Sequence, residues 1–171
     1  KNHSISLTNT STVATGNNAY IWRFGDNTSS TNTSPIKTYS AYGNYNIRLV
    51  VTTDKLCNDS ITKPIEVYPM PTAKFNINDS TQCFKNHSIV RKNTSTVAAG
   101  SSTYLWKFGD NTSSINTSPT KTYSSYGNYN LKLIVTTNKQ CNDSTTKAVE
   151  IYPMPVAKFT INDSTQCFKN H

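Results

Sequence analysis

The side chains with the most distinctive chemistry in this chain are four cysteines, which could form disulfide bonds or bind a metal ion. They are Cys57, Cys83, Cys141 and Cys167. None belongs to a close Cys-x-x-Cys pair of the kind that holds a structural zinc ion. The cysteines therefore predict disulfide bonds in an oxidising compartment and no metal site.

Histidine and carboxylate side chains could act as general acids, general bases or metal ligands. The three histidines, His3, His87 and His171, are spaced 84 residues apart, so they occupy one position of a repeat. Residues so far apart in a linear array cannot converge on one metal ion or one nucleophile, and most carboxylates recur in the same way. No catalytic triad, acid–base pair or phosphate-binding loop results. The sequence predicts no enzyme, no catalytic residue and no cofactor.

The repeat itself is visible in YIWRFGDNTSS, Tyr20–Ser30, which returns as YLWKFGDNTSS at Tyr104–Ser114. A shift of 84 residues aligns the whole chain without a gap, and about three quarters of the positions are identical. A unit of that length can enclose its own core. We expect a domain over residues 1–70 that lacks its own first strand, a complete domain over residues 71–154, and the first strand of a further domain over residues 155–171.

Apolar residues alternate with polar ones along each repeat, which predicts strands with one buried face. The breaks between them, such as GDNTSSINTSP and SSYGN, are rich in turn-forming residues. No segment has helical periodicity, so we expect an all-β protein with about seven short strands per repeat. In the second repeat the expected strands cover residues 73–78, 88–95, 104–108, 121–123, 129–137 and 145–152.

Composition limits the partners of this chain. It has 17 basic and 9 acidic residues and a net charge of +8, but the cations are spread evenly through the repeats. This favours a solvated basic surface, with weak attraction to anionic polysaccharide, over a nucleic-acid site. No apolar run is long enough to cross a bilayer, so no direct membrane insertion is expected.

Three motifs resemble the polycystic kidney disease (PKD) domain. They are WRFGDN and WKFGDN, then SPIKTY and SPTKTY, and then YGNYNIRL and YGNYNLKL. The resemblance spans both repeats and is similar in detail to the cysteine-containing PKD repeats of secreted surface proteins from Bacteroidetes-like bacteria. It implies tandem immunoglobulin-like (PKD-type) β-sandwiches joined end to end. Two prolines in each YPMP joint should limit bending between them.

The most specific motif is expected to be structural. Its residues are Trp22, Phe24, Gly25 and Asp26, repeated as Trp106, Phe108, Gly109 and Asp110. The two aromatic side chains should fill the space between the sheets, the glycine should let the chain turn, and the aspartate should accept hydrogen bonds from the turn. Calcium binding by the aspartates is the alternative, but few carboxylates lie nearby in sequence. Tyr45 and Tyr129 are predicted to be tyrosine corners.

Two positions depart from the PKD pattern. The second glycine of the signature is replaced by Asn27 and Asn111, which is tolerable because Asn adopts a positive φ more readily than most residues. An apolar position of the second strand is Leu7 in one repeat and Arg91 in the other. We expect Arg91 at the rim of the sandwich with its charged head in water.

Modification sites are also indicated. Asp-Ser followed by Ile or Thr resembles the O-glycosylation motif of secreted Bacteroidetes proteins. It occurs at Ser60, Ser80, Ser144 and Ser164. The resemblance implies a glycoprotein.

The expected strands constrain how the cysteines can pair. Cys83 should lie about 30 Å from the joint, whereas Cys141 follows a turn at the joint, so a bond between them within one domain is out of reach. We predict staples across each joint, from the Cys83-type residue of one repeat to the Cys141-type residue of the next, with partners largely outside this chain or in a neighbouring molecule. Pairing Cys57 with Cys83, Cys141 with Cys167, or Cys83 with Cys141 would contradict the strand assignment.

The segment after the second repeat has two interpretations. It is either part of a window cut from a longer array, or a donor strand in which Pro155–Phe168 of one molecule completes the first domain of the next. The function predicted from all these features is a structural or adhesive protein, extracellular or at the cell surface, whose repeats form a stalk or fibre with copies of itself. The alternative is a carbohydrate-binding accessory module of a secreted protein or enzyme, with anionic or neutral polysaccharide as its partner.

Overall fold

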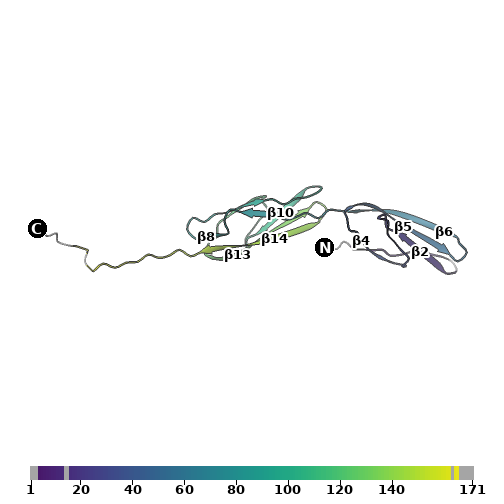
Figure 1. The fold of residues 1–171 in the computed structure, drawn as a ribbon, viewed down its shortest axis with the longest axis horizontal. Coiled ribbons are helices and arrows are strands. Elements are labelled where there is room, and N and C mark those ends of the chain that lie inside the picture. The colour runs from purple at the N-terminus through teal and green to yellow at the C-terminus, as the bar shows by residue number, and fades with distance from the viewer. Residues whose placement is uncertain (1–3, 14–15, 163, 166–171) are drawn as a thin grey trace. The chain divides into compact units, whose positions relative to one another are not determined.

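The computed structural model describes residues 4–13, 16–162 and 164–165 of the chain. In these residues all regular structure is β-strand, which confirms the predicted all-β class. The chain divides into two compact units, and the main boundary falls between Pro71 and Thr72 (Figure 1). We call the strands before this boundary the first sandwich and those after it the second sandwich.

The first sandwich has two sheets. Its strands are β1 (Ser4–Ser6), β2 (Asn18–Arg23), β3 (Ser29–Ser30), β4 (Ile36–Thr38), β5 (Gly43–Thr53) and β6 (Asn58–Val67). One sheet has the order β3-β2-β5-β6, and β1 pairs with β4 in the other. Trp22 and Leu49 from the larger sheet form a core cluster with Tyr39, and Ile5 and Leu7 pack against that cluster. The two sheets therefore share one core, as expected of a sandwich.

The second sandwich repeats this plan with two further strands. Its strands are β7 (Phe75–Ile77), β8 (Thr81–Cys83), β9 (Ile89–Asn93), β10 (Ser102–Lys107), β11 (Ser113–Ser114), β12 (Thr120–Lys121), β13 (Gly127–Thr137) and β14 (Asn142–Tyr152). One sheet has the order β12-β9-β7 and the other the order β11-β10-β13-β14-β8. Figure 1 shows β10, β13 and β14 together in this unit.

The first strand of the second sandwich differs from the single strand predicted over residues 73–78. After β7 the chain turns and adds β8 to the opposite sheet, parallel to β14. The turn is held by side chains, because Asp79 Oδ1 accepts the Thr81 amide at 3.0 Å and Asn78 Oδ1 accepts the Val90 amide at 3.0 Å. Asn and Asp favour such local turns, so the crossover follows from the sequence NDST.

The alternation of buried and exposed residues places the core between the sheets. In β13 the inward residues Leu131, Leu133 and Val135 are fully buried, and Phe75 of β7 meets Trp106 of β10 edge-on at 4.9 Å between ring centroids. Phe75 and Trp106 belong to opposite sheets, so this contact joins them. The described residues contain no helix that is long and apolar enough to span a membrane.

Candidate functional site

The repeated Trp-x-Phe motif anchors one sheet of each sandwich. Trp22 and Phe24 are 7% and 4% exposed, and Trp106 and Phe108 are 0% and 4% exposed. The Trp106 indole Nε1 donates a hydrogen bond to the Asn116 carbonyl at 3.0 Å, so its single polar atom is satisfied. These aromatic residues are structural, since their faces are closed to a ligand by the opposite sheet.

The turn after the motif has positive φ at two positions, the glycine and the asparagine two residues after it. Gly109 has a φ of +83°, and a Cβ placed there would lie 2.8 Å from the Asn130 amide nitrogen. Gly25 has a φ of +80°. Asn27 and Asn111 have φ values of 65° and 66°, which confirms the expectation for the position where the PKD pattern has its second glycine.

The aspartate of the motif holds the turn and also forms an ion pair. Asp110 Oδ1 accepts hydrogen bonds from the Thr112 amide at 3.1 Å and from the Thr112 hydroxyl at 2.6 Å. Its other oxygen lies 2.5 Å from the Lys121 ammonium, which also lies over the rings of Phe108 and Tyr123. Burial raises the pKa of Asp110, but the hydrogen bonds from Lys121 and Thr112 and the charge of Lys121 outweigh it, so the pKa falls below its usual value.

The first sandwich contains the same arrangement. Asp26 bonds the Thr28 amide at 3.2 Å, and its second oxygen lies 2.6 Å from Lys37. Each carboxylate is thus already engaged by an ammonium group and a turn. Among the described residues there is no group of three or more His, Cys, Asp or Glu side chains that could hold a metal ion. We call each Asp–Lys–Thr arrangement a latch.

The tyrosine corners are present as predicted. The Tyr45 hydroxyl donates to the Ala41 carbonyl at 2.9 Å, and the Tyr129 hydroxyl donates to the Ser125 carbonyl at 2.8 Å. Each ring also stacks on the tyrosine of the neighbouring strand segment, with centroids 3.7 Å apart for Tyr123 and Tyr129. Both tyrosines therefore stabilise the start of the long strand, β5 or β13.

Arg91 contradicts its prediction. Its side chain is 1% exposed instead of lying at the rim with its head in water. Nε donates to the Pro119 carbonyl at 3.2 Å, and the guanidinium lies 4.6 Å from the Phe108 ring centroid and 5.8 Å from that of Trp106. The reason is that β9 is the central strand of its sheet and Arg91 points inward like Ile89, so its stem cannot reach water. Burial lowers the pKa of Arg91 to about 10.

His87 is a buried structural residue of the second sandwich. Its Nε2 accepts the Tyr123 amide at 2.7 Å, and its Nδ1 lies 2.7 Å from the Phe84 carbonyl oxygen. Both ring nitrogens are therefore used to join the segment after β8 to the segment after β12. No motif in the sequence indicated this structural role.

The structure describes three of the four cysteines, and Cys167 lies outside the described residues. Cys57 and Cys83 are exposed, Cys141 is partly exposed, and all three are free thiols in this chain. Cys83 lies opposite Tyr152 at the end of β14, whereas Cys141 directly precedes β14. Ten residues of strand span about 33 Å, so these two thiols are too far apart to bond within the sandwich. The staples to partners beyond this chain stay a prediction.

All four predicted glycosylation serines are exposed. Ser60 lies on β6, Ser144 lies on β14, and Ser80 and Ser164 lie outside the strands. Each hydroxyl is therefore sterically open to modification. The structure leaves the modification itself as a prediction.

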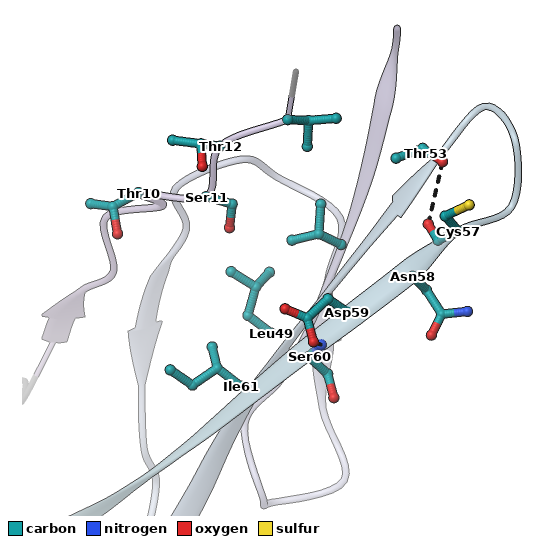
Figure 2. A pocket seen from close by; sticks show the side chains of 12 residues that line it. Thr10, Ser11, Thr12, Leu49, Thr53, Cys57, Asn58, Asp59, Ser60 and Ile61 are labelled. Carbon is teal, nitrogen blue, oxygen red and sulfur yellow. Dashed lines mark hydrogen bonds between the residues drawn. The ribbon is translucent and has the colours of Figure 1, made fainter. Parts of the chain in front are cut away.

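A groove of about 550 Å³ opens on the first sandwich (Figure 2). Its lining residues are Thr10, Ser11, Thr12, Val13, Leu49, Val51, Thr53, Cys57, Asn58, Asp59, Ser60 and Ile61. One wall is the segment after β1, the other wall is β6, and inward residues of β5 form the floor. An apolar floor between two backbone segments suits an extended peptide.

The fold and these structural motifs together define a tandem immunoglobulin-like sandwich protein whose repeated residues serve packing and turns. The family model described as PKD domain matches residues 2–68 and residues 68–152. The chain belongs to the PKD domain family, as its motifs predicted. PKD domains are non-catalytic modules, structural or adhesive, typical of extracellular or secreted proteins.

Solved structures similar to this chain include two PKD domains and a structure of fibronectin(III)-like modules. The PKD1 domain of the Vibrio cholerae metalloprotease PrtV is 28% identical, with 48% of this chain and 98% of that chain covered and a TM-score of 0.43. The PKD1 domain of Vibrio anguillarum Epp is 25% identical, with coverages of 51% and 99% and a TM-score of 0.45. The fibronectin(III)-like modules of Clostridium thermocellum CbhA are 18% identical, with coverages of 88% and 85% and a TM-score of 0.44. Among curated proteins none matches the chain.

Proposed function

We propose that this chain is a structural segment of an extracellular or cell-surface protein, in which PKD sandwiches in series form a stalk or fibre. The observation that carries the proposal is that the residues shared by the two repeats hold the turns and strands of each sandwich in place. The aspartate of each latch is engaged by a lysine and a turn, and each tyrosine corner is bonded to backbone. Because the shared residues stabilise each sandwich, they favour the role of a spacer over that of a ligand-binding module.

The test is immunogold electron microscopy of the native source with an antibody against this chain, together with microscopy of the purified native protein. Label at the cell surface or outside the cell, on extended particles with a domain-sized axial repeat, is the expected result. Label confined to the cell interior would contradict the proposed location. Gels run with and without reductant on the same sample test the predicted cysteine staples separately.

Carbohydrate binding is a second candidate, and one observation favours it. Tyr42 and Tyr126 occupy the same repeat position and are 63% and 61% exposed, so both sandwiches present a tyrosine ring to solvent at this position. Exposed aromatic rings on a basic surface suit contact with anionic or neutral polysaccharide. Affinity electrophoresis in gels containing heparin, cellulose or chitin tests this. Retardation that disappears in the double variant Tyr42→Ala, Tyr126→Ala would favour the binding role.

Glycosylation belongs to the same proposal. We expect glycans on the exposed serines of the Asp-Ser motif, since exposed hydroxyls on a secreted chain are open to a glycosyltransferase. Intact-mass spectrometry of the native protein, followed by peptide mapping, checks this. A native mass equal to that of the bare chain would contradict it.

A further inference from the structure

Two arginines face each other on the outer face of the larger sheet of the first sandwich. Arg23 of β2 and Arg48 of β5 are directly opposite each other in the antiparallel register, and both side chains are exposed. Like charges at opposite positions destabilise a sheet, so stability does not explain this pair. Arg48 Nη2 donates to Ser60 Oγ of β6 at 3.0 Å, which turns its guanidinium away from Arg23. Within the described part of the chain neither arginine forms an ion pair.

The pair recurs in the second sandwich with lysines in place of arginines. The shift of 84 residues puts Lys107 of β10 at the position of Arg23 and Lys132 of β13 at that of Arg48. β10 and β13 are neighbouring strands of one sheet, as β2 and β5 are. The side chain thus differs at both positions while the positive charge is retained. A shared charge in a destabilising pair indicates a ligand of negative charge.

A hollow opens beside each pair of cations. In the first sandwich it measures about 640 Å³, and its lining includes Arg23, Asn27 and Ser29. In the second sandwich it measures about 350 Å³, and its lining includes the repeat partners Lys107, Asn111 and Ser113. The strand end that carries the cation and the turn after the Trp-x-Phe motif therefore form the walls of both hollows.

The hollows offer amide and hydroxyl groups to a ligand. The asparagine and serine side chains of their walls make no hydrogen bond within the described residues, whereas the hydroxyls of Thr28 and Thr112 are held by the latches. Each latch also engages the carboxylate of its turn, since the aspartate pairs with the lysine. A cation beside free amide and hydroxyl groups suits a sugar that carries a sulfate or carboxylate group.

The rest of this sheet face favours a polysaccharide over a nucleic acid. The outward residues beside the two arginines are Ile21, Asn46, Val50 and Thr62, and none of these is aromatic. Single-stranded nucleic acids are bound largely by stacking on aromatic side chains. Glu66 shares the face, but it lies four residues along β6 from Thr62, the partner of Arg48, which is about 13 Å. The arginine pair therefore keeps its positive charge.

We propose that the outer face of the larger sheet in each sandwich binds a linear anionic polysaccharide. Arg23 and Arg48, or Lys107 and Lys132, donate hydrogen bonds to its sulfate or carboxylate groups, and the side chains of the hollow bond its hydroxyl groups. The bound anion also reduces the repulsion between the paired cations. This inference rests on carbohydrate binding, the second candidate function above, and gives it a ligand class and a site that does not include the exposed tyrosines.

Affinity electrophoresis of the full chain tests this site. The gels contain dextran sulfate or alginate, and neutral dextran serves as the matched polymer without charge. The site variant changes all four cations, by Arg23→Gln, Arg48→Gln, Lys107→Gln and Lys132→Gln. The control variant removes the same charge from exposed lysines that lie outside the outer sheet face, by Lys55→Gln, Lys63→Gln, Lys139→Gln and Lys147→Gln.

The wild-type chain should be retarded by at least one polyanion and not by dextran, and added salt should weaken the binding. The site variant should bind that polyanion at least about tenfold more weakly, because it loses charge-assisted hydrogen bonds, and the control variant less than about threefold more weakly. Equal losses in the two variants would mean attraction to net charge alone and would overturn the site. Absence of binding to both polyanions, or tighter binding of single-stranded DNA, would overturn it as well.

An NMR titration of the wild-type chain locates the contact without any variant. Oligosaccharides of the retarding polymer should shift the amide signals of Arg23, Asn27 and Arg48 and of their repeat partners most strongly. Shifts centred on Tyr42 and Tyr126 would overturn this site. Retardation by cellulose or chitin that depends on those tyrosines, without retardation by a polyanion, would do the same and leave carbohydrate binding in place, so the two failures are distinguishable.

Discussion

Replacing Arg91 with leucine should stabilise the second sandwich. In the part of the chain that the structure describes, neither Nη1 nor Nη2 of Arg91 has a hydrogen-bond partner, and each buried unpaired donor costs about 1–3 kcal/mol. The contacts of the guanidinium with the rings of Phe108 and Trp106 stabilise the folded state by about 0.5–2 kcal/mol. Leucine is the residue that the first repeat has at this position, Leu7, so its shape suits the fold. The net expectation is a gain of about 1–3 kcal/mol in the free energy of unfolding.

Differential scanning calorimetry of the full chain measures this effect. A gain of that size raises the unfolding midpoint of one sandwich by roughly 5–15 °C. The reciprocal variant Leu7→Arg should lower the midpoint of the other sandwich, which identifies the two transitions. Because burial lowers the folded-state pKa of Arg91 to about 10, the folded protein releases the proton before the unfolded chain does. The buried charge of Arg91 therefore destabilises the fold fully below pH 10 and less as the pH rises above 10. The gain in the free energy of unfolding from Arg91→Leu should accordingly become smaller above pH 10.

Two outcomes would refute this reasoning. A lower midpoint for Arg91→Leu would mean that the guanidinium stabilises the core through its ring contacts and its bond to Pro119. An advantage that stays constant above pH 10 would mean that the charge of Arg91 is not the source of the cost. Arg91→Met serves as a control for shape, since it keeps a long flexible stem and removes the charge.

Three further predictions concern the repeated turn and the tyrosine corner. Asp110→Ala should lower the free energy of unfolding by about 1–3 kcal/mol at pH 7, and urea titrations should show the difference disappearing as the pH falls below the usual carboxylate pKa, about 4. The lowered pKa of Asp110 gives this sign, because a carboxylate stabilised in the fold contributes above its unfolded pKa and is lost on protonation. Gly109→Ala should cost about 2–4 kcal/mol by thermal unfolding, since the new Cβ meets the Asn130 backbone at positive φ. Tyr129→Phe should cost about 0.5–1.5 kcal/mol by urea unfolding, through loss of its one bond to backbone.

Controls separate these causes from general damage to the fold. Lys121→Met should reproduce most of the Asp110→Ala loss, because it removes the other half of the ion pair. Asn111→Gly keeps the positive φ and should be tolerated, so an equal loss there would show that the turn is sensitive to any change. A pH-independent loss for Asp110→Ala would contradict the electrostatic part of the argument.

Local patterns carried most of the prediction from sequence. Alternation identified the strands, and the spacing of Trp106, Phe108 and Gly109 identified the core aromatics and the turn, because each depends on residues within a few positions. For the latch, the sequence predicted that Asp110 holds the turn but not that it pairs with Lys121. The ion pair was missed because Lys121 reaches Asp110 from a strand of the opposite sheet. The position of Arg91 was mispredicted for the same kind of reason, because the location of β9 at the centre of its sheet depends on pairing with β7 and β12. Strands and turns can be predicted from residues close together in sequence, whereas the exposure of a side chain depends on which distant segments pack around it.

The parallel pairing of β8 with β14 has a mechanical consequence. Glu150, Ile151 and Tyr152 of the last strand lie opposite Thr81, Gln82 and Cys83 of a strand near the start of the same sandwich. Tension that draws these two strands in opposite directions along their length acts in shear, so the hydrogen bonds between them bear the load together instead of opening one after another. This parallel pairing therefore suits the stalk role that we propose for the chain.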